Sequence, residues 1–282
     1  MEIRMLEKDQ LKLSFLVKGA DVSYLNSLRR IMMNKVPTMA IEDVEIRKNS
    51  SVLYDETVAH RLGLIPIRTE SGCYVQREKC TCGGSGCDRC SVTYTLSVEG
   101  PGMVYSRDLI PQDPRAVPAL DNIPITKLTK DQKVVLEARA VMSTGKVHSK
   151  WQPTTACGYK NYPEIEVSDR CDACGQCVDE CPRGILTTAG GRVTVIEGRL
   201  EECSLCRLCE RACLGTGIGE ESAIRVRSDG SRFIFVVEGD GSLTVREVIE
   251  KALEYLKSES DELCEKIGEL SGVTGDEEDK DE

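Results

Sequence analysis

Cysteine is the residue type in this chain with the most distinctive chemistry. The 282 residues include fifteen cysteines but only two histidines, and twelve of the cysteines fall into three groups of four. The first ten residues are charged and unlike a signal peptide, so we expect a cytoplasmic chain whose thiols stay reduced. Grouped cysteines in that compartment indicate metal binding rather than disulfides. The three outside the groups, Cys73, Cys157 and Cys264, are expected to be buried or idle thiols.

Two of the groups have the spacing of ferredoxins that hold two iron–sulfur clusters. In such proteins the fourth cysteine of each run binds the cluster of the other run. We therefore predict two [4Fe-4S] clusters, the first held by Cys171, Cys174, Cys177 and Cys213, and the second by Cys203, Cys206, Cys209 and Cys181. Pro182 follows the first run, whereas Leu214 stands at the matching place in the second. A pair of zinc sites is the alternative that this spacing leaves open.

The third group lies in a short glycine-rich loop, CTCGGSGCDRC. Its members are Cys80, Cys82, Cys87 and Cys90. Four thiolates within eleven residues suit one tetrahedral zinc ion of structural type, because four protein ligands leave no open position for chemistry. Iron in place of zinc, or an empty loop, remain alternatives.

The charge balance argues against a direct grip on DNA. The formal net charge is −10 with thiols neutral. A four-iron cluster or a zinc ion bound by four thiolates adds about −2, so the loaded chain would carry about −16. Binding to phosphates calls for the opposite sign, which disfavours a nucleic-acid-binding zinc protein. No apolar run is long enough to span a bilayer, so no membrane contact is expected.

Both ends of the chain predict regular elements. Alternating apolar residues at 3–5 and 11–17 predict a hairpin. Asp21 is a candidate N-cap for a helix over 22–34. At the other end, residues 232–238 predict a strand, and Thr244 with Glu247 forms a capping box before a helix that extends to about Leu270. The broad apolar stripe of that helix predicts packing on another subunit; packing on its own domain is the alternative.

The middle of the chain divides by composition. Residues 41–162 are expected to form strands and loops, with strands at 92–98 and 133–141. From about 163 to 225 there are eight cysteines and, between 164 and 225, no aromatic residue. We expect little apolar core there and predict that metal holds this segment together.

Three motifs outside the cysteine groups resemble the alpha subunit family of cellular RNA polymerases. Residues 26–32 (NSLRRIM), running on to Thr38, resemble its signature helix, and residues 59–67 (AHRLGLIPI) resemble its second signature. Residues 235–241 (FVVEGDG) are similar to its closing segment. The resemblance covers nearly the whole chain. The paired ferredoxin runs favour the archaeal branch of this family, because the eukaryotic counterpart, the third-largest subunit of polymerase II, generally lacks them. The loop at 80–90 resembles the zinc loop of that eukaryotic counterpart. The chain departs from bacterial alpha in having both metal inserts.

The resemblance implies an α+β fold with a discontinuous organisation. An alpha-like dimerisation domain would comprise residues 1–44 and 226–271. A mostly β insert domain with the four-cysteine loop would occupy 45–162, a ferredoxin-like domain 163–225, and an acidic tail 272–282. The implied function is a non-catalytic assembly subunit of DNA-directed RNA polymerase. It would pair with the smaller subunit L and then recruit the small and the large subunits.

The resemblance also implies interface residues. These are Leu25, Leu28, Arg29, Arg30, Met32, Val248, Leu253 and Leu256. The two arginines are candidates for contact with a large subunit, with a solvated helix face as the alternative. His60 and Arg61 could be interface or structural residues.

We expect no active site in this chain, which would be an enzyme only as part of a nucleotidyltransferase complex. It lacks an aspartate triplet for magnesium, a phosphate-binding glycine loop followed by lysine, and a nucleophile elbow. The cysteine runs alone would favour another class, an iron–sulfur electron-transfer protein or the small subunit of an oxidoreductase. The alpha-like motifs at both ends favour the polymerase subunit.

Overall fold

The structure is a computed structural model that describes residues 1–70, 72–215 and 221–271. The predicted acidic tail at 272–282 lies outside the described residues. The chain divides into two compact units. The first comprises Met1–Lys8, Ser14–Leu25 and Gly158–Val236, and the second comprises Asp9–Leu13, Asn26–Cys157 and Val237–Glu282. This grouping follows packing, whereas the predicted domain boundaries follow motifs, so those boundaries stay a prediction.

A four-stranded sheet in the order β1-β2-β14-β11 organises the first unit. Its strands are β1 (Glu2–Lys8), β2 (Lys12–Lys18), β14 (Ile224–Gly239) and β11 (Thr154–Val167). The predicted hairpin is confirmed as β1 and β2, and the predicted strand at 232–238 is the second half of β14. The Phe15 and Phe235 rings stack on this sheet with centroids 5.4 Å apart, and Tyr159 lies 5.9 Å from Phe235.

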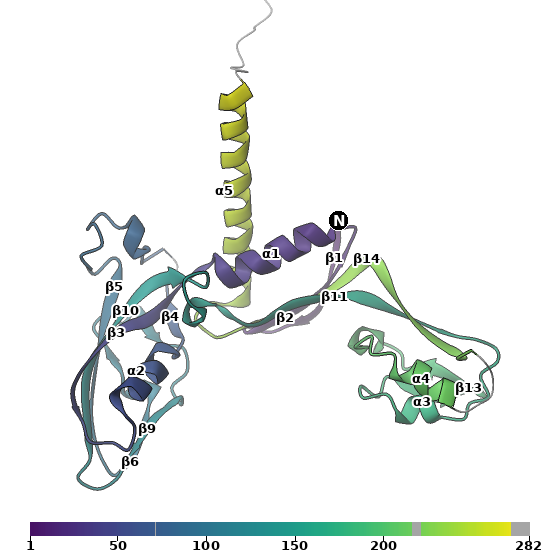
Figure 1. Ribbon diagram of the computed structural model, residues 1–282, viewed down its shortest axis with the longest axis horizontal. Coiled ribbons are helices and arrows are strands. Elements are labelled where there is room, and N and C mark those ends of the chain that lie inside the picture. The colour runs from purple at the N-terminus through teal and green to yellow at the C-terminus, as the bar shows by residue number, and fades with distance from the viewer. Residues whose placement is uncertain (71, 216–220, 272–282) are drawn as a thin grey trace, which may run out of the picture. The chain divides into compact units, whose positions relative to one another are not determined.

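The cysteine-rich segment lies between the far ends of β11 and β14 (Figure 1). It contains α3 (Gln176–Asp179), β12 (Leu186–Ala189), β13 (Arg192–Val195), the 3₁₀ turn η4 (Leu200–Glu202) and α4 (Leu208–Gly215). The expectation of little apolar core needs a correction. Aliphatic side chains form a small core here together with three buried cysteines; the aliphatic members are Ile185, Leu186, Val193, Ile224 and Val226. These residues supply packing that the lack of aromatics concealed.

Helix α1 (Val22–Asn34) has the predicted N-cap. The Asp21 Oδ1 atom accepts a hydrogen bond from the Ser23 amide at 2.7 Å. The helix buries its apolar face, and Leu25 and Met32 are 1% and 0% exposed. Amphipathic spacing and a side-chain cap together explain why this segment is helical.

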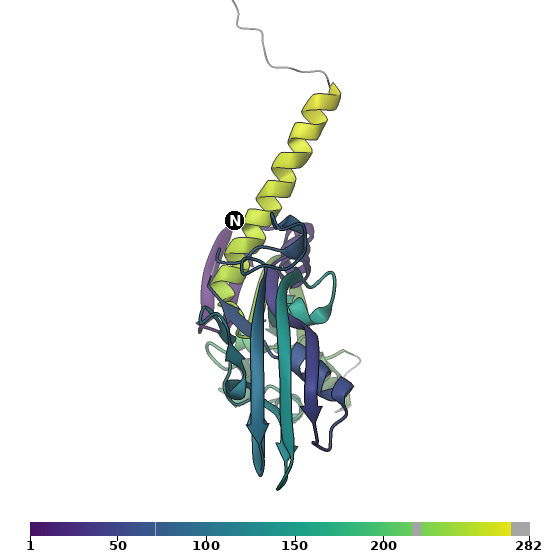
Figure 2. The same cartoon turned by 90° about the vertical axis from the view of Figure 1, so that its left-hand side faces the viewer.

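A six-stranded sheet forms the centre of the second unit, in the order β7-β5-β10-β3-β4-β8. The strands are β3 (Pro37–Asn49), β4 (Ile67–Thr69), β5 (Ser91–Glu99), β7 (Ile110–Pro111), β8 (Ala116–Pro118) and β10 (Lys133–Thr144). Figure 2 shows the long antiparallel strands β5, β10 and β3 side by side. A separate two-stranded sheet pairs β6 (Gly102–Tyr105) with β9 (Pro124–Leu128). The predicted strands at 92–98 and 133–141 are confirmed as β5 and β10.

An α-helix interrupts the region that was expected to contain only strands and loops. Helix α2 (Asp55–Gly63) carries two acids in its first turn, and its Val58 and Leu62 side chains are fully buried. Acids near a helix N-terminus and apolar residues four positions apart are ordinary helix features. The prediction missed them because the segment is short.

Helix α5 (Val245–Ser271) begins with the predicted capping box. The Thr244 amide donates to Glu247 Oε2 at 2.9 Å, and the Glu247 amide donates back to Thr244 Oγ1 at 3.3 Å. The apolar face of the first turns is buried, with Val248 at 0% exposure, but Leu263 is 59% exposed. Both views show the C-terminal half of α5 projecting beyond the sheet of its own unit (Figures 1 and 2). None of the described helices is long and apolar enough to cross a membrane.

Candidate metal centres and interaction surface

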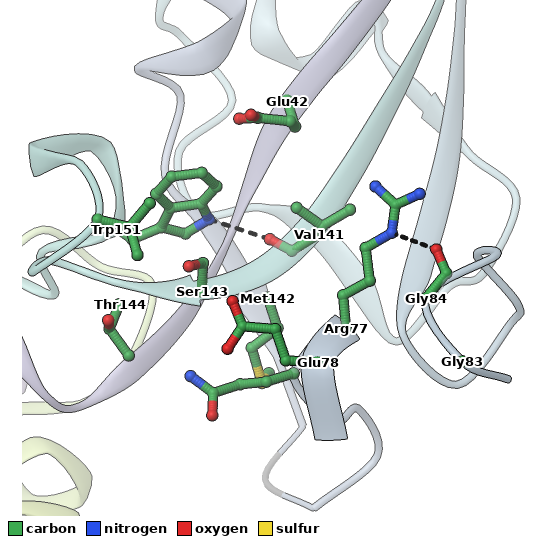
Figure 3. A pocket seen from close by; sticks show the side chains of 12 residues that line it. Glu42, Arg77, Glu78, Gly83, Gly84, Val141, Met142, Ser143, Thr144 and Trp151 are labelled. Atoms are coloured by element: carbon green, nitrogen blue, oxygen red, sulfur yellow. Dashed lines mark hydrogen bonds between the residues drawn. The ribbon is translucent and has the colours of Figure 1, made fainter. Parts of the chain in front are cut away.

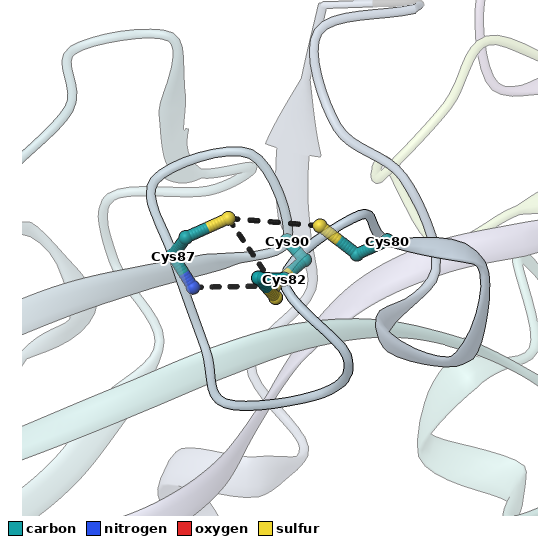
Figure 4. Close-up of side chains that lie close together, drawn as sticks. All are labelled: Cys80, Cys82, Cys87 and Cys90. Atoms are coloured by element: carbon teal, nitrogen blue, oxygen red, sulfur yellow. Dashed lines mark hydrogen bonds between the residues drawn. The ribbon is translucent and has the colours of Figure 1, made fainter.

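The loop at 80–90 brings four sulfur atoms to one point (Figure 4). The Sγ–Sγ distances are 3.6 Å for Cys80 and Cys87, 3.7 Å for Cys82 and Cys90, and 3.9 Å for Cys87 and Cys90. A tetrahedral ion with metal–sulfur bonds of about 2.3 Å has ligand–ligand edges of about 3.8 Å. The four thiols therefore fit one four-coordinate metal ion, as the spacing predicted.

Tight turns create this arrangement. The Gly83 amide donates to the Cys80 carbonyl at 3.2 Å, and the Cys90 amide donates to the Cys87 carbonyl at 2.9 Å. Gly86 has a φ of +89°, a left-handed conformation that glycine adopts without steric cost. Hydrogen bonds, first of all from the Gly86 amide, lower the pKa of the Cys82 thiol to about 6, whereas burial raises that of Cys90 to about 11. Bound metal would favour the thiolate form of both.

The two ferredoxin-like runs adopt the same loop conformation at matching positions. Ala173 and Leu205, each two residues after the first cysteine of its run, have φ values of +59° and +57°. Gly175 and Arg207, each one residue after the second cysteine, have φ values of +83° and +58°. A left-handed conformation costs a non-glycine residue about 1–2 kcal/mol. Its repetition indicates that the path of each loop around its cysteines is determined by the structure rather than by local preference.

The predicted ligands of the second cluster line one small cavity. These are Cys181, Cys203, Cys206 and Cys209, and Arg183 and Arg207 border the same cavity. The other predicted set gathers around Cys177. Burial raises the pKa of the Cys177 thiol to about 11, and the charges of Cys213, Cys171 and Cys174 contribute to that rise. The structure thus brings each predicted set of four together, and the assignment to clusters stays a prediction.

The spacing of these eight sulfurs differs from that of the loop at 80–90. Among the described residues, only the Cys80–Cys90 group has its metal-binding atoms all within 4.8 Å of one another. Ligands of a single ion must lie that close, whereas ligands of a four-iron cluster each bind a separate iron.

Backbone amides point at several of these sulfurs. The Val193 amide donates to Cys171 Sγ at 3.4 Å, and the Ala223 amide donates to Cys213 Sγ at 3.2 Å. In the second set, the Leu205 amide donates to Cys203 Sγ at 3.5 Å. Such bonds stabilise thiolates and influence the potential of a bound cluster.

The predicted interface set needs a correction. Leu25, Leu28, Met32 and Val248 are at most 5% exposed, because the apolar faces of both helices pack within this chain. Arg29 is partly buried, and Asn26 Oδ1 accepts hydrogen bonds from its guanidinium at 3.0 and 3.3 Å. The exposed members are Arg30 and Leu253, with Leu256 partly exposed. Leu263 and Ile267 belong to the apolar stripe that was predicted to pack partly on another subunit, but they were not among the predicted interface residues.

The remaining polar motifs have structural roles. Arg61 donates through Nη1 to the Ile125 carbonyl at 2.9 Å, and His60 borders a surface hollow of the second unit. A cavity of about 540 Å³ lies beside the four-cysteine loop (Figure 3). There Arg77 donates to the Gly84 carbonyl at 2.7 Å, and the Trp151 indole donates to the Val141 carbonyl at 3.0 Å. These hydrogen bonds to backbone carbonyls connect neighbouring segments of the chain.

The three ungrouped thiols differ in exposure. Cys73 and Cys157 are half-buried, and Cys264 is exposed on α5. Burial raises the pKa of Cys157 to about 12, which leaves it protonated and unreactive at neutral pH.

Comparison with known proteins identifies both inserts. Residues 44–157 match the family model of the RNA polymerase Rpb3/RpoA insert domain. Residues 165–187, which contain the first ferredoxin-like run, match the 4Fe-4S binding domain. Because the polymerase match lies outside the two ferredoxin-like runs, the alternative of an electron-transfer protein is not favoured.

Full-length relatives agree with these matches. The chain is 43% identical over 271 residues to DNA-directed RNA polymerase subunit Rpo3 of Methanosarcina acetivorans, an alignment that covers 96% of this chain and 99% of the relative. Identity is 44% to Rpo3 of Methanosarcina mazei, with the same coverage. It is 43% over 269 residues to Rpo3 of Archaeoglobus fulgidus, covering 95% and 98%. With such identity over nearly its whole length, the chain belongs to the archaeal Rpo3 family of DNA-directed RNA polymerase subunits.

Proposed function

We propose that this chain, a non-catalytic assembly subunit of DNA-directed RNA polymerase, pairs with the smaller alpha-like subunit L through helix α5. The pair would then recruit the other small subunits and the large subunits, with the dimerisation domain formed from residues 1–44 and 226–271. One observation carries the proposal. The apolar side chains Val245 and Val248 at the start of α5 are buried, yet Leu253, Leu263 and Ile267 further along are 40%, 59% and 56% exposed. Apolar side chains aligned on an exposed helix face mark a surface that another protein covers.

The metal centres have structural roles in this proposal. Cys80, Cys82, Cys87 and Cys90 would hold one zinc ion, and the tetrahedral spacing of their sulfurs supports it. Cys171, Cys174, Cys177 and Cys213 would hold one [4Fe-4S] cluster, and Cys203, Cys206, Cys209 and Cys181 the second. Such clusters cross-link the loops that bind them and can exchange single electrons. The clusters would add to the stability that the small apolar core around Ile185 and Val193 provides.

The charge of the chain fits assembly rather than template binding. Its net charge is −10, so phosphate contacts would come from other subunits of the complex. We also expect the chain to lie in the cytoplasm, a reducing compartment in which its grouped thiols would stay reduced.

Anaerobic affinity purification of the tagged chain from an archaeal host tests this proposal. The proposal predicts subunit L and the large polymerase subunits in the eluate, about eight irons per chain for two four-iron clusters, and about one zinc. A chain that elutes alone, or with redox enzymes, would contradict the assembly role. An iron content of about four per chain would contradict the second cluster but would leave the assembly role unaffected.

A further inference from the structure

A half-buried lysine lies directly behind a predicted cluster ligand. Lys160 stands on β11, and its ammonium donates to the Glu201 carbonyl at 2.7 Å and to the Cys203 carbonyl at 2.6 Å. Those two carbonyls bracket the end of the 3₁₀ turn η4, where the chain enters the second ferredoxin-like run. Cys203 itself is 7% exposed. One side chain from a strand of the four-stranded sheet thus fixes the backbone of the first ligand of that run.

The charge of this ammonium needs a negative neighbour. Its two hydrogen-bond acceptors are neutral carbonyls. Two carboxylates lie near it: Glu202 is paired with Arg199, and Glu201 is also engaged elsewhere. That carboxylate accepts from Arg4 Nη2 at 2.7 Å and from the Tyr162 hydroxyl at 3.3 Å. A partly buried cation is costly unless charge of the opposite sign lies close by. A cluster bound by four thiolates would carry about −2, and Cys203 would bring that charge next to Lys160.

From this geometry we propose that Lys160 is a positioning residue for the second cluster, holding the Cys203 backbone in place for ligation and balancing the charge of the bound thiolates. The inference rests on the proposed function, because it needs a cluster at Cys203, Cys206, Cys209 and Cys181. It adds a residue outside the cysteine runs to that site. The first cluster should not depend on Lys160, because its ligands are held by other contacts, such as the Val193 amide on Cys171.

The test is the Lys160→Met variant of the full chain, purified anaerobically with its polymerase. Methionine keeps much of the side-chain volume but removes the charge and both hydrogen bonds. We expect iron per chain to fall to about half of the wild-type content. The midpoint potential of any remaining second cluster should be more negative, because a lost positive charge disfavours the reduced form. Lys160→Arg, which keeps charge and donors, should retain most of the iron. Lys18→Met, at a β2 side chain that is 59% exposed, should retain all of it.

Double variants identify which cluster is lost. Lys160→Met combined with Cys206→Ser should contain as much iron as Cys206→Ser alone, since both act on the second cluster. Combined with Cys174→Ser, it should lose nearly all iron. Full iron with unchanged potentials of both clusters in Lys160→Met would overturn the inference, and so would an equal loss from both clusters. Wild-type chain with only four irons would instead overturn the two-cluster proposal on which the inference rests.

Discussion

Arg4 and Glu201 form an ion pair with 2.7 Å between Nη2 and Oε1, although 197 positions separate them in the sequence. The pair joins the first strand of the four-stranded sheet to the turn that precedes the second ferredoxin-like run. Lys160 and Tyr162 on β11 reach the same turn. Three side chains from the sheet therefore hold one short segment of the cluster-binding region, but they do so under different solvent exposure.

Because Arg4 is more exposed than Lys160, replacing it should have little effect on the iron content. Its side chain is 61% exposed, and an exposed ion pair contributes only about 0.2–1 kcal/mol. We expect Arg4→Ala to leave the iron content at the wild-type value, measured by iron assay after anaerobic purification. If Arg4→Ala lost as much iron as Lys160→Met, the hold on Cys203 would depend on the whole set of contacts and not on the half-buried lysine.

Local patterns in the sequence predicted most elements at the two ends of the chain. The Asp21 cap and the Thr244–Glu247 capping box each depend on residues within three positions, and both form as predicted. The spacing of Cys80, Cys82, Cys87 and Cys90 likewise predicted that these four sulfurs would gather, because a tight loop leaves few alternatives. These features succeeded since their partners are close in the sequence.

Features that depend on distant partners escaped prediction. Nothing near Lys160 in the sequence indicates that its ammonium contacts residues 201 and 203, 41 and 43 positions away. The burial of Leu28 and Val248 within this chain depends on tertiary packing. The sequence could not predict it, because an apolar helix face can pack on its own chain as well as on a partner. Helix α2 was missed because nine residues give a weak periodic pattern.

The crossed assignment of the fourth cysteines predicts how pairs of substitutions combine. Cys181→Ser and Cys206→Ser should affect the same cluster, so the double variant should lose no more iron than the more affected single variant. Cys181→Ser with Cys174→Ser should affect both clusters and lose nearly all iron. Iron assay and electron paramagnetic resonance of the reduced protein measure these contents.

The alternative assignment gives the opposite pattern. If each run held its own cluster, Cys181→Ser with Cys174→Ser would lose only one cluster. Cys264→Ser, at an exposed thiol on α5, is the matched control and should leave iron unchanged.

The four-cysteine loop should bind zinc independently of iron. Cys87→Ser removes one corner of the tetrahedron, so we expect zinc to fall from about one to near zero per chain while iron stays near eight. Elemental analysis of one sample gives both numbers. Cys73→Ser, at a nearby thiol outside the group, should keep the zinc. A ninth iron per chain in place of zinc would contradict the prediction of zinc, but it would still support a metal site at these four cysteines.

Asp240 should make stability depend on pH in the direction opposite to that of most carboxylates. Burial raises the pKa of its carboxyl, although hydrogen bonds from Ser242 at 2.9 and 2.6 Å oppose the rise. A folded-state pKa above the unfolded value of about 3.9 means that ionisation costs stability. That cost is absent below the unfolded pKa and fully present above the folded one.

The Asp240→Asn variant tests this sign. Asparagine keeps an oxygen for Ser242 and cannot ionise, so we expect a melting temperature at pH 7 equal to or above that of the wild type. The difference in melting temperature between the variant and the wild type should narrow or stay constant as the pH is lowered from 7 to 5. A larger difference at pH 5 would contradict the raised pKa of Asp240. Asp240→Ala, which removes the acceptor, should melt lower at both pH values.

The exposed stripe of α5 should bind subunit L without stabilising the isolated chain. Leu263 and Ile267 are 59% and 56% exposed, so replacing both by glutamate should change the melting temperature little. Burying one such side chain at an interface contributes about 1.5–3 kcal/mol, so the double variant should bind subunit L at least about tenfold more weakly in a titration.

Ile110→Glu, at a 65% exposed position on β7, is the matched control and should bind normally. Equal weakening by both substitutions would show a general effect of added charge. Unchanged binding by the α5 variant would assign the partner to another face, and Arg30 on α1 would become the next residue to test.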